Sequence, residues 1–180
     1  MPQVRKLSIR NVKSSRPGVT LLELIIVMAL MSLIIATGAQ FLSMYDRTLA
    51  HHELEHMYSL SMYLQRRAVI EHRTLELVFN QENNSYSWLD SSHQFARPVT
   101  YGILDAVKGP PSHPEKIVLN PISFIHRKLV FFPDGSISAG TIYVIDTHKS
   151  CLYALTCGIS QVALLRQYRY DNGTWHALLS

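Results

Sequence analysis

A single carboxylate lies inside the longest apolar segment of this chain. The segment covers residues 19–36, and Glu23 is its only charged residue. In apolar surroundings, whether lipid or packed helices, an unpaired carboxylate is costly, so an acid in this place is a functional candidate by default. Glu23 therefore needs a partner that neutralises it or donates hydrogen bonds to it.

A second pattern could do chemistry with a metal ion. His52, Glu53 and His56 match the arrangement in which two histidines on one helical face bind zinc and a glutamate acts as the base. A membrane-anchored zinc peptidase is therefore one alternative. No third ligand stands at a typical spacing, so we favour a solvated helix face with i, i+4 pairs, and we expect no metal, no cofactor and no enzymatic activity.

The chain has two cysteines, Cys151 and Cys157, six positions apart. Along one straight strand that separation is too long for a disulfide, so a bridge would need a turn between them. An oxidising compartment would permit the bridge. A disulfide and two free thiols are both open alternatives from the sequence.

Basic and aromatic residues alternate near the C-terminus, as they do in proteins that bind single-stranded nucleic acid. Arg166 and Arg169 would be the contact residues, beside Tyr168, Tyr170 and Trp175. The same composition is typical of a strand with one solvent face and aromatic side chains against a core. We favour the strand and do not expect nucleic acid as a partner.

The formal net charge of +4 is a property of the N-terminus. Five of the 17 basic residues lie in residues 1–18, which hold no acid, so 12 basic and 13 acidic residues remain in 19–180. The chain beyond residue 18 is therefore close to neutral, and its charge gives no argument for nucleic-acid binding.

The apolar segment is long enough to cross a bilayer. With Phe41 and Leu42 included it exceeds the roughly 20 residues that a spanning helix needs, and the apolar part of a secretory signal peptide is shorter. Basic residues precede it, so we expect a single-pass protein with a cytoplasmic N-terminus, although a plain signal anchor would have the same hydropathy. Helical spacing continues beyond it, which predicts one helix with a transmembrane half at 19–45 and an amphipathic half at 46–73.

The stretch from Gly18 to Leu24 resembles the type III signal of type IV pilins and pseudopilins, in which a basic leader ends in glycine and glutamate is the fifth mature residue. The resemblance implies that a prepilin peptidase removes residues 1–18 and methylates Val19, where most members have phenylalanine. It implies a bacterial inner-membrane protein with a periplasmic C-terminal domain. It also implies that the α-amino group of a neighbouring subunit's Val19 pairs with Glu23 and fixes the register of a filament.

From residue 74 the spacing changes to that of strands. Alternation predicts a hairpin over 74–80 and 85–89, and further strands at 128–132, 140–145, 151–156, 162–170 and 174–178. Residues 102–123, which are rich in Gly and Pro, predict a long loop with a short strand at 117–119. The expected fold class is α+β, with one long N-terminal helix packed on antiparallel sheet and a β-rich domain over 74–180.

A second resemblance concerns residues 129–144. Phe-Phe-Pro-Asp-Gly at 131–135, followed by Gly-Thr-Ile at 140–142, looks like a hairpin of the H-type minor pseudopilins of type II secretion; the Gly-Arg-hydrophobic-Arg stretch common in that family is absent from 158–169. The resemblance implies a structural subunit of a periplasmic pseudopilus. Its partners would be other pseudopilins, the prepilin peptidase, an inner-membrane assembly platform and the lipid bilayer. A minor type IV pilin that acts in pilus assembly or DNA uptake is the alternative.

Overall fold

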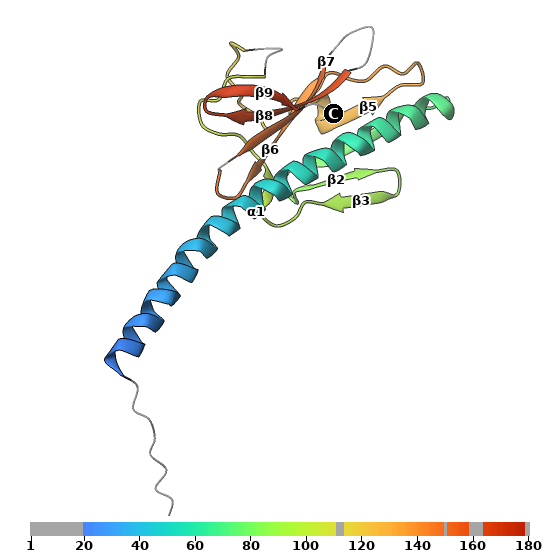
Figure 1. Ribbon diagram of the computed structural model, residues 1–180. Helices are drawn as coiled ribbons and strands as arrows, with labels where there is room; N and C mark the ends of the chain where they lie inside the picture. The colour runs from blue at the N-terminus through green and yellow to red at the C-terminus, as the bar shows by residue number, and fades with distance from the viewer. Residues whose placement is uncertain (1–19, 111–113, 150, 159–163, 179–180) are drawn as a thin grey trace, which may run out of the picture. The chain divides into compact units, whose positions relative to one another are not determined.

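The computed structural model describes residues 20–110, 114–149, 151–158 and 164–178, and within them the side chains of 37–44 are not described. The chain forms two compact units, Met1–Ala39 and Gln40–Ser180. One helix, α1, runs from Leu21 to Ile70 and belongs to both (Figure 1). The long helix expected over 19–73 is confirmed, and both of its ends lie slightly inside the expected bounds.

The described part of the first unit is an apolar helix. Every described side chain up to residue 36 is exposed, with Leu21 at 77% and Ile35 at 72%. The hydroxyl of Ser32 donates to the carbonyl of Ala29 at 2.8 Å, so this polar group is satisfied inside the helix. Among the helices in the described ranges, none is both long and apolar enough to cross a membrane. The membrane span at 19–45 stays a prediction.

In the second unit, α1 buries one stripe of side chains. The buried positions recur three or four residues apart and have no exposed surface: Ala50, Leu54, Met57, Ser61, Leu64 and Ala68. Ser61 is the polar member of the stripe, and its hydroxyl donates to the carbonyl of Met57 at 2.7 Å, so its burial leaves no unpaired group. The amphipathic pattern expected over 46–73 is confirmed, although the apolar residue next to the stripe, Val69, is exposed.

Helix α1 is terminated by a residue in the left-handed backbone conformation. His72 has a φ of 51°, and its N–H bonds the carbonyl of Val69 at 3.4 Å. The N–H of Arg73 reaches back to the carbonyl of Ala68 at 3.2 Å. Many helices end with this pair of hydrogen bonds, usually at a glycine, and they redirect the chain into the first strand.

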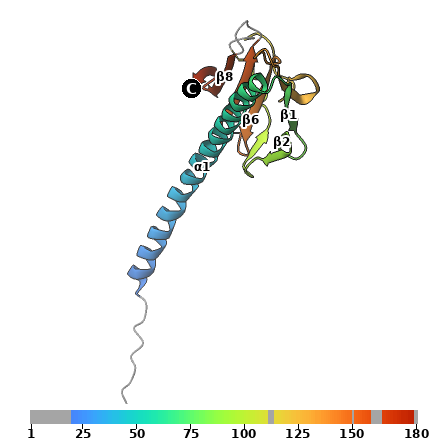
Figure 2. The ribbon, with the colours of Figure 1, turned by 90° about the vertical axis from the view of Figure 1, so that its right-hand side faces the viewer.

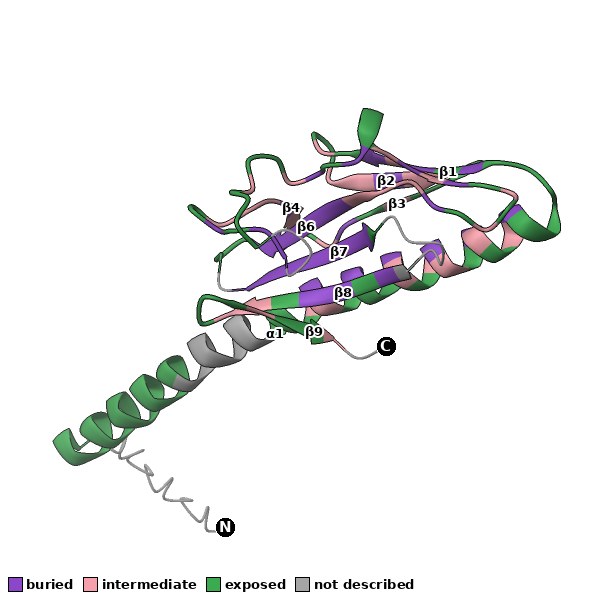
Figure 3. Cartoon of the chain, turned by 90° about the horizontal axis from the view of Figure 1, so that it is seen from above, coloured by how far each residue is buried: buried purple, intermediate pink, exposed green. Residues whose placement is uncertain are grey.

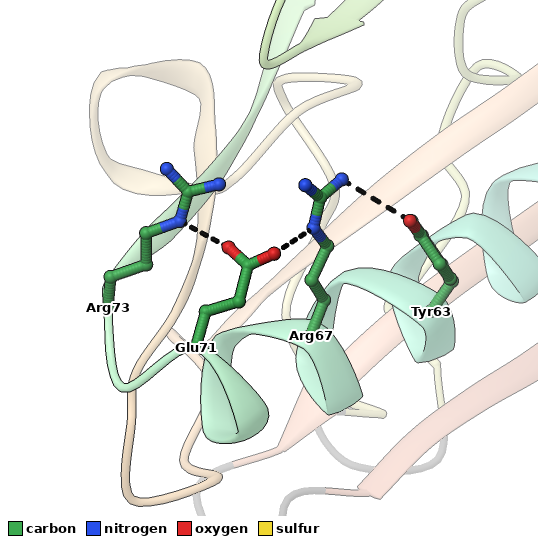
Figure 4. A network of polar contacts seen from close by, with 4 residues as sticks. All are labelled: Tyr63, Arg67, Glu71 and Arg73. Atoms are coloured by element: carbon green, nitrogen blue, oxygen red, sulfur yellow. Dashed lines mark hydrogen bonds and ion pairs between the residues drawn. The ribbon is translucent and has the colours of Figure 1, made fainter.

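An exposed polar network covers the same end of the helix (Figure 4). The two carboxylate oxygens of Glu71 accept from Nε of Arg67 at 2.6 Å and from Nε of Arg73 at 2.5 Å. Arg67 also donates to the hydroxyl of Tyr63 at 3.3 Å. The hydrogen bond from Arg67 holds the pKa of Glu71 below its ordinary value. Because these side chains are solvated, the network orders the helix end more than it stabilises the fold.

The first sheet has four antiparallel strands in the order β3-β2-β1-β5. Their bounds are β1 Leu75–Asn80, β2 Ser85–Trp88, β3 Ser91–Gln94 and β5 Lys128–Phe131. The hairpin expected over 74–89 is confirmed as β1 and β2. The strand β3 was not predicted, because it is a polar and largely exposed edge strand without apolar alternation.

The second sheet has five antiparallel strands in the order β4-β6-β7-β8-β9. Their bounds are β4 Val99–Tyr101, β6 Gly140–Asp146, β7 Leu152–Gly158, β8 Leu164–Asp171 and β9 Thr174–Leu178. The last four confirm the expected strands, whereas β4 is too short to show a pattern. Asn172 and Gly173 join β8 to β9 with positive φ of 49° and 83°, as a two-residue hairpin turn requires.

The turn at residues 132–136 is present, but it does not join two strands of one sheet. The N–H of Phe132 donates to the carbonyl of Ser136 at 2.9 Å, and Phe131 makes an isolated bridge with Ile137. Beyond this local contact, β5 pairs with β1, while β6 pairs with β4 and β7. The hairpin expected over 129–144 is therefore wrong beyond the turn, because the chain crosses here from the first sheet to the second.

The loop expected over 102–123 is confirmed for its described residues, 102–110 and 114–123, but the strand at 117–119 is wrong. Ile117 makes only an isolated bridge with Lys108. The indole N–H of Trp175 donates to the carbonyl of Lys108 at 2.9 Å, and Val107 is buried beside Tyr143 in a small cluster. The described part of this loop thus covers one face of the second sheet with Val107 and Val118, whereas Ile117 and Leu119 are exposed.

The main core lies between α1 and both sheets. Figure 2 shows the two sheets next to the second half of the helix, and Figure 3 shows that the buried residues of that half lie on its side toward the strands. The core includes Leu54 from α1, Leu77 and Phe131 from the first sheet, and Ile142 and Leu155 from the second. This arrangement confirms the α+β class with a helix packed on antiparallel sheets.

Candidate functional site

A buried acid ties α1 to the segment that contains β3. The side chain of Glu53 is 8% exposed, and its Oε2 lies 2.9 Å from Nε2 of His93. The N–H of Ala96 donates to Oε1 at 3.1 Å. Both oxygens of the carboxylate are therefore paired, which is the condition for burying it. The solvated face expected at 52–56 is wrong for Glu53.

Two aromatic side chains extend this contact. Nδ1 of His56 lies 2.5 Å from the hydroxyl of Tyr86, and the ring centroids of His56 and His93 are 4.7 Å apart. Burial, and then the neighbouring imidazole of His93, lower the pKa of His56. Burial also raises the pKa of Tyr86, so its hydroxyl keeps its proton. The donor in this contact depends on the tautomer of His56: a neutral ring with its proton on Nδ1 donates to the Tyr86 oxygen, and one with its proton on Nε2 accepts from the hydroxyl.

The zinc-peptidase arrangement requires a glutamate that is free to activate a zinc-bound water. Glu53 is instead engaged by His93, whereas His52 is exposed. The i, i+4 pair on this part of the helix is His51 with Glu55, at 3.4 Å. In the ranges described, no three His, Cys, Asp or Glu side chains are already placed to hold a metal ion.

Cys151 and Cys157 are both free and buried. Strand β7 follows Cys151 directly and pairs with β8 without interruption from Leu152 to Gly158. A strand rises about 3.3 Å per residue, so the two Cα atoms lie well beyond the roughly 7 Å at which a bridge can form. Burial raises the pKa of the thiols, to about 12 for Cys151 and about 11 for Cys157. Of the two alternatives, the structure has the free thiols.

Arg166 and Arg169 are exposed, but they do not form one surface. Both lie on β8, whose pairing with β7 is regular, and their separation of three residues places them on opposite faces of the sheet. Arg169 donates to Asp171 at 2.5 Å. The two arginines therefore do not share one face of the sheet, and a contact with nucleic acid stays an untested alternative.

At the other end of the chain, Thr20 caps the first turn of α1. Its carbonyl accepts the N–H of Leu24 at 3.2 Å, and its hydroxyl accepts the N–H of Glu23 at 3.3 Å. Thr followed three residues later by Glu is the spacing of a capping box, and an acid in the first turn also suits the helix dipole. Gly18 and Val19 lie outside the described residues.

This N-terminal segment matches a known family motif. Residues 13–39 match the prokaryotic N-terminal methylation motif. The chain carries a type IV prepilin-like signal. The matched residues include Gly18, Val19 and Glu23, so the match supports the pilin and pseudopilin class in the broad sense. No curated protein and no solved structure matches the chain.

The prepilin-like signal ends where the first compact unit ends. The match stops at residue 39, and the first unit is Met1–Ala39. The residues that match the motif thus belong to the first compact unit, and the match does not extend into the second. What residues 40–180 contribute has to be argued from their own side chains.

Sequence reasoning missed the partners of Glu53 and His56 for one reason. His93, Ala96 and Tyr86 lie between 30 and 43 positions away along the chain, and no local pattern links them to the helix. Thr20 was also missed, although the signal for it was present as Thr-x-x-Glu at the start of the apolar segment.

Proposed function

We propose that the chain is a minor pseudopilin, a structural subunit of the periplasmic pseudopilus of a type II secretion system. One observation carries the proposal: the prepilin-like signal at 13–39 opens a helix whose side chains from residue 21 to 36 are exposed and, apart from Glu23 and Ser32, apolar. A helix that is apolar on all sides needs lipid or other helices around it.

In this proposal, prepilin peptidase cuts between Gly18 and Val19 and methylates the new N-terminus. Residues 19–45 then hold the subunit in the inner membrane, with the N-terminus in the cytoplasm and residues 74–180 in the periplasm. Other pseudopilins and an inner-membrane assembly platform are the partners. The subunit is structural, and the work of polymerisation is supplied by another component.

Assembly would rest on the helices, with Glu23 as the element that sets register. When apolar helices pack side by side, contacts alone permit sliding, but a carboxylate must meet a positive charge. The methylated α-amino group of a neighbouring subunit's Val19 supplies that charge. A subunit that is out of register by one turn would leave both charges unpaired.

The intact mass of the protein from membranes of a host with a prepilin peptidase tests the first step. The wild-type protein should lack residues 1–18 and carry one added methyl group, and Gly18→Ala should stay at full length. A full-length wild-type protein would indicate a plain signal anchor and would overturn the proposal.

Deletion of the gene in a strain that has both type II secretion and type IV pili tests the finer assignment. The expected result is loss of protein secretion with intact pili, restored by the wild-type gene. Loss of pili or of DNA uptake with intact secretion would instead identify the alternative, a minor type IV pilin.

A further inference from the structure

Three imidazoles gather on one surface of the second unit. His52 and His56 are one helical turn apart on α1 and are exposed, and His93 on β3 is partly exposed beside His56. The centroids of the His56 and His93 rings are 4.7 Å apart. Metal–nitrogen bonds of about 2.0–2.1 Å in a tetrahedral site place two ring centres roughly 5 Å apart.

Two of these rings are held in the way that metal-binding histidines are held. His93 uses Nε2 to contact the buried carboxylate of Glu53 at 2.9 Å, and His56 uses Nδ1 to contact Tyr86. Histidine ligands of metals typically bond a carboxylate or another polar group through the second ring nitrogen, which fixes the tautomer and the orientation of the ring. When Nε2–H of His93 donates to Glu53 and Nδ1–H of His56 donates to the Tyr86 oxygen, Nδ1 of His93 and Nε2 of His56 carry no proton and can bind a metal ion.

We propose that His52, His56 and His93 bind one Zn²⁺ ion, with Glu53 and Tyr86 holding two of the rings in place. Histidines at i and i+4 on one helix face are a known zinc-binding spacing. Three imidazoles leave a fourth tetrahedral position for water. Nitrogen ligands favour transition ions over Ca²⁺ and Mg²⁺, which prefer oxygen. The site is not that of a peptidase, because Glu53 is bound to His93.

His52 is the ligand that has to move. In the described ranges no group of three His, Cys, Asp or Glu side chains is placed to hold a metal ion, so in this proposal His52 turns toward His56 and His93 as the ion binds. The side chain of His52 is exposed, and a change of rotamer there disturbs no packing. The bound ion would join α1 to the edge strand β3, and so would stabilise the docking of the β2–β3 hairpin on the helix.

The experiment uses the full chain, purified in detergent and freed of metal with EDTA. Zn²⁺ is titrated against a colorimetric chelator, and thermal midpoints are measured with and without one equivalent. We expect one ion per chain and a higher midpoint with Zn²⁺ but not with Ca²⁺. His52→Ala should weaken the affinity tenfold or more and remove the shift, without changing the midpoint of the metal-free protein.

The matched control is His176→Gln. His176 is an exposed histidine on β9, far from α1 in the sequence, and this variant should bind Zn²⁺ like the wild type. His93→Gln tests the strand ligand, and its metal-free midpoint shows whether the variant is folded. The proposal is overturned if the wild type binds no Zn²⁺ at micromolar concentration, or if His52→Ala or folded His93→Gln binds it as tightly as the wild type.

Discussion

The hydroxyl of Thr20 accepts the backbone N–H of Glu23 at 3.3 Å, so the residue that fills the first turn of α1 is also the one acid of the apolar segment. Two physical roles therefore meet at Glu23. Its place in the capping box stabilises the helix start, and its charge would pair with a neighbouring subunit. Substitutions can separate the two roles, because glutamine serves the capping box but carries no charge.

Glu23→Gln is expected to be cleaved normally and to keep the helix start, yet to fail in assembly as fully as Glu23→Ala. The reason is that glutamine preserves the capping spacing, while the interaction with a neighbour's α-amino group needs the carboxylate. Intact mass reports cleavage, and cross-linking between neighbouring subunits in membranes reports assembly. If Glu23→Gln assembles like the wild type, capping is the function of the residue and the register role is lost.

The buried carboxylate of Glu53 makes a second, independent prediction. Glu53→Ala removes the partner of His93 and of the Ala96 N–H, and is expected to lower the free energy of unfolding by about 1–3 kcal/mol. The matched control is Glu55→Ala, two positions along the helix, where the side chain is 57% exposed and pairs with His51. A surface pair of that kind contributes between about 0 and 1 kcal/mol. Urea unfolding of the detergent-solubilised chain, followed by near-UV circular dichroism, should separate the two variants. Equal losses would mean that Glu53 is solvated in solution.

The contrast between Glu53 and Glu55 also shows what the sequence could predict. The period of apolar residues defined the helix and most strands, because burial of one face leaves a pattern within a few residues. That pattern classes Glu53 and Glu55 alike as solvated. The burial of Glu53 depends on His93 and Ala96, and their position follows from the docking of β3, an edge strand that has no apolar pattern of its own.

The turn at 132–136 shows a different limit. Pro-Asp-Gly predicts a local reversal correctly, since proline and glycine fix the backbone angles there. Which strand pairs with which is decided by the core, and β5 and β6 pair in separate sheets. At the N-terminus, by contrast, the prepilin-like signal is a short contiguous segment, so residue order alone is enough to predict it.

Cys151 and Cys157 are expected to be unreactive in the folded protein. Burial raises the pKa of the thiols to about 12 and about 11, so the thiolate that attacks a disulfide reagent is scarce at pH 8 as well as hard to reach. An aromatic disulfide reagent should label neither thiol in the native chain and both in urea without a reductant. If neither thiol is labelled in urea until a reductant is added, the two cysteines form a disulfide. That result would contradict the strand geometry of β7.

Two glycines at paired ends of β6 and β7 give the sharpest test of packing in the second sheet. A Cβ atom on Gly140 would lie 2.4 Å from Cδ1 of Phe124 and 2.6 Å from its Cγ, whereas a Cβ on Gly158 would meet nothing within 4 Å. The ring of Phe124 is 4% exposed and packs on Phe79 with centroids 5.9 Å apart, so moving it aside would disturb the core.

Gly140→Ala is therefore expected to lower the free energy of unfolding by about 1–3 kcal/mol, as overpacking does. Gly158→Ala should change stability by no more than about 0.5 kcal/mol, as a surface substitution does. Thermal and urea unfolding measure both variants, and a Gly140→Ala protein as stable as Gly158→Ala would mean that Phe124 does not pack over the start of β6.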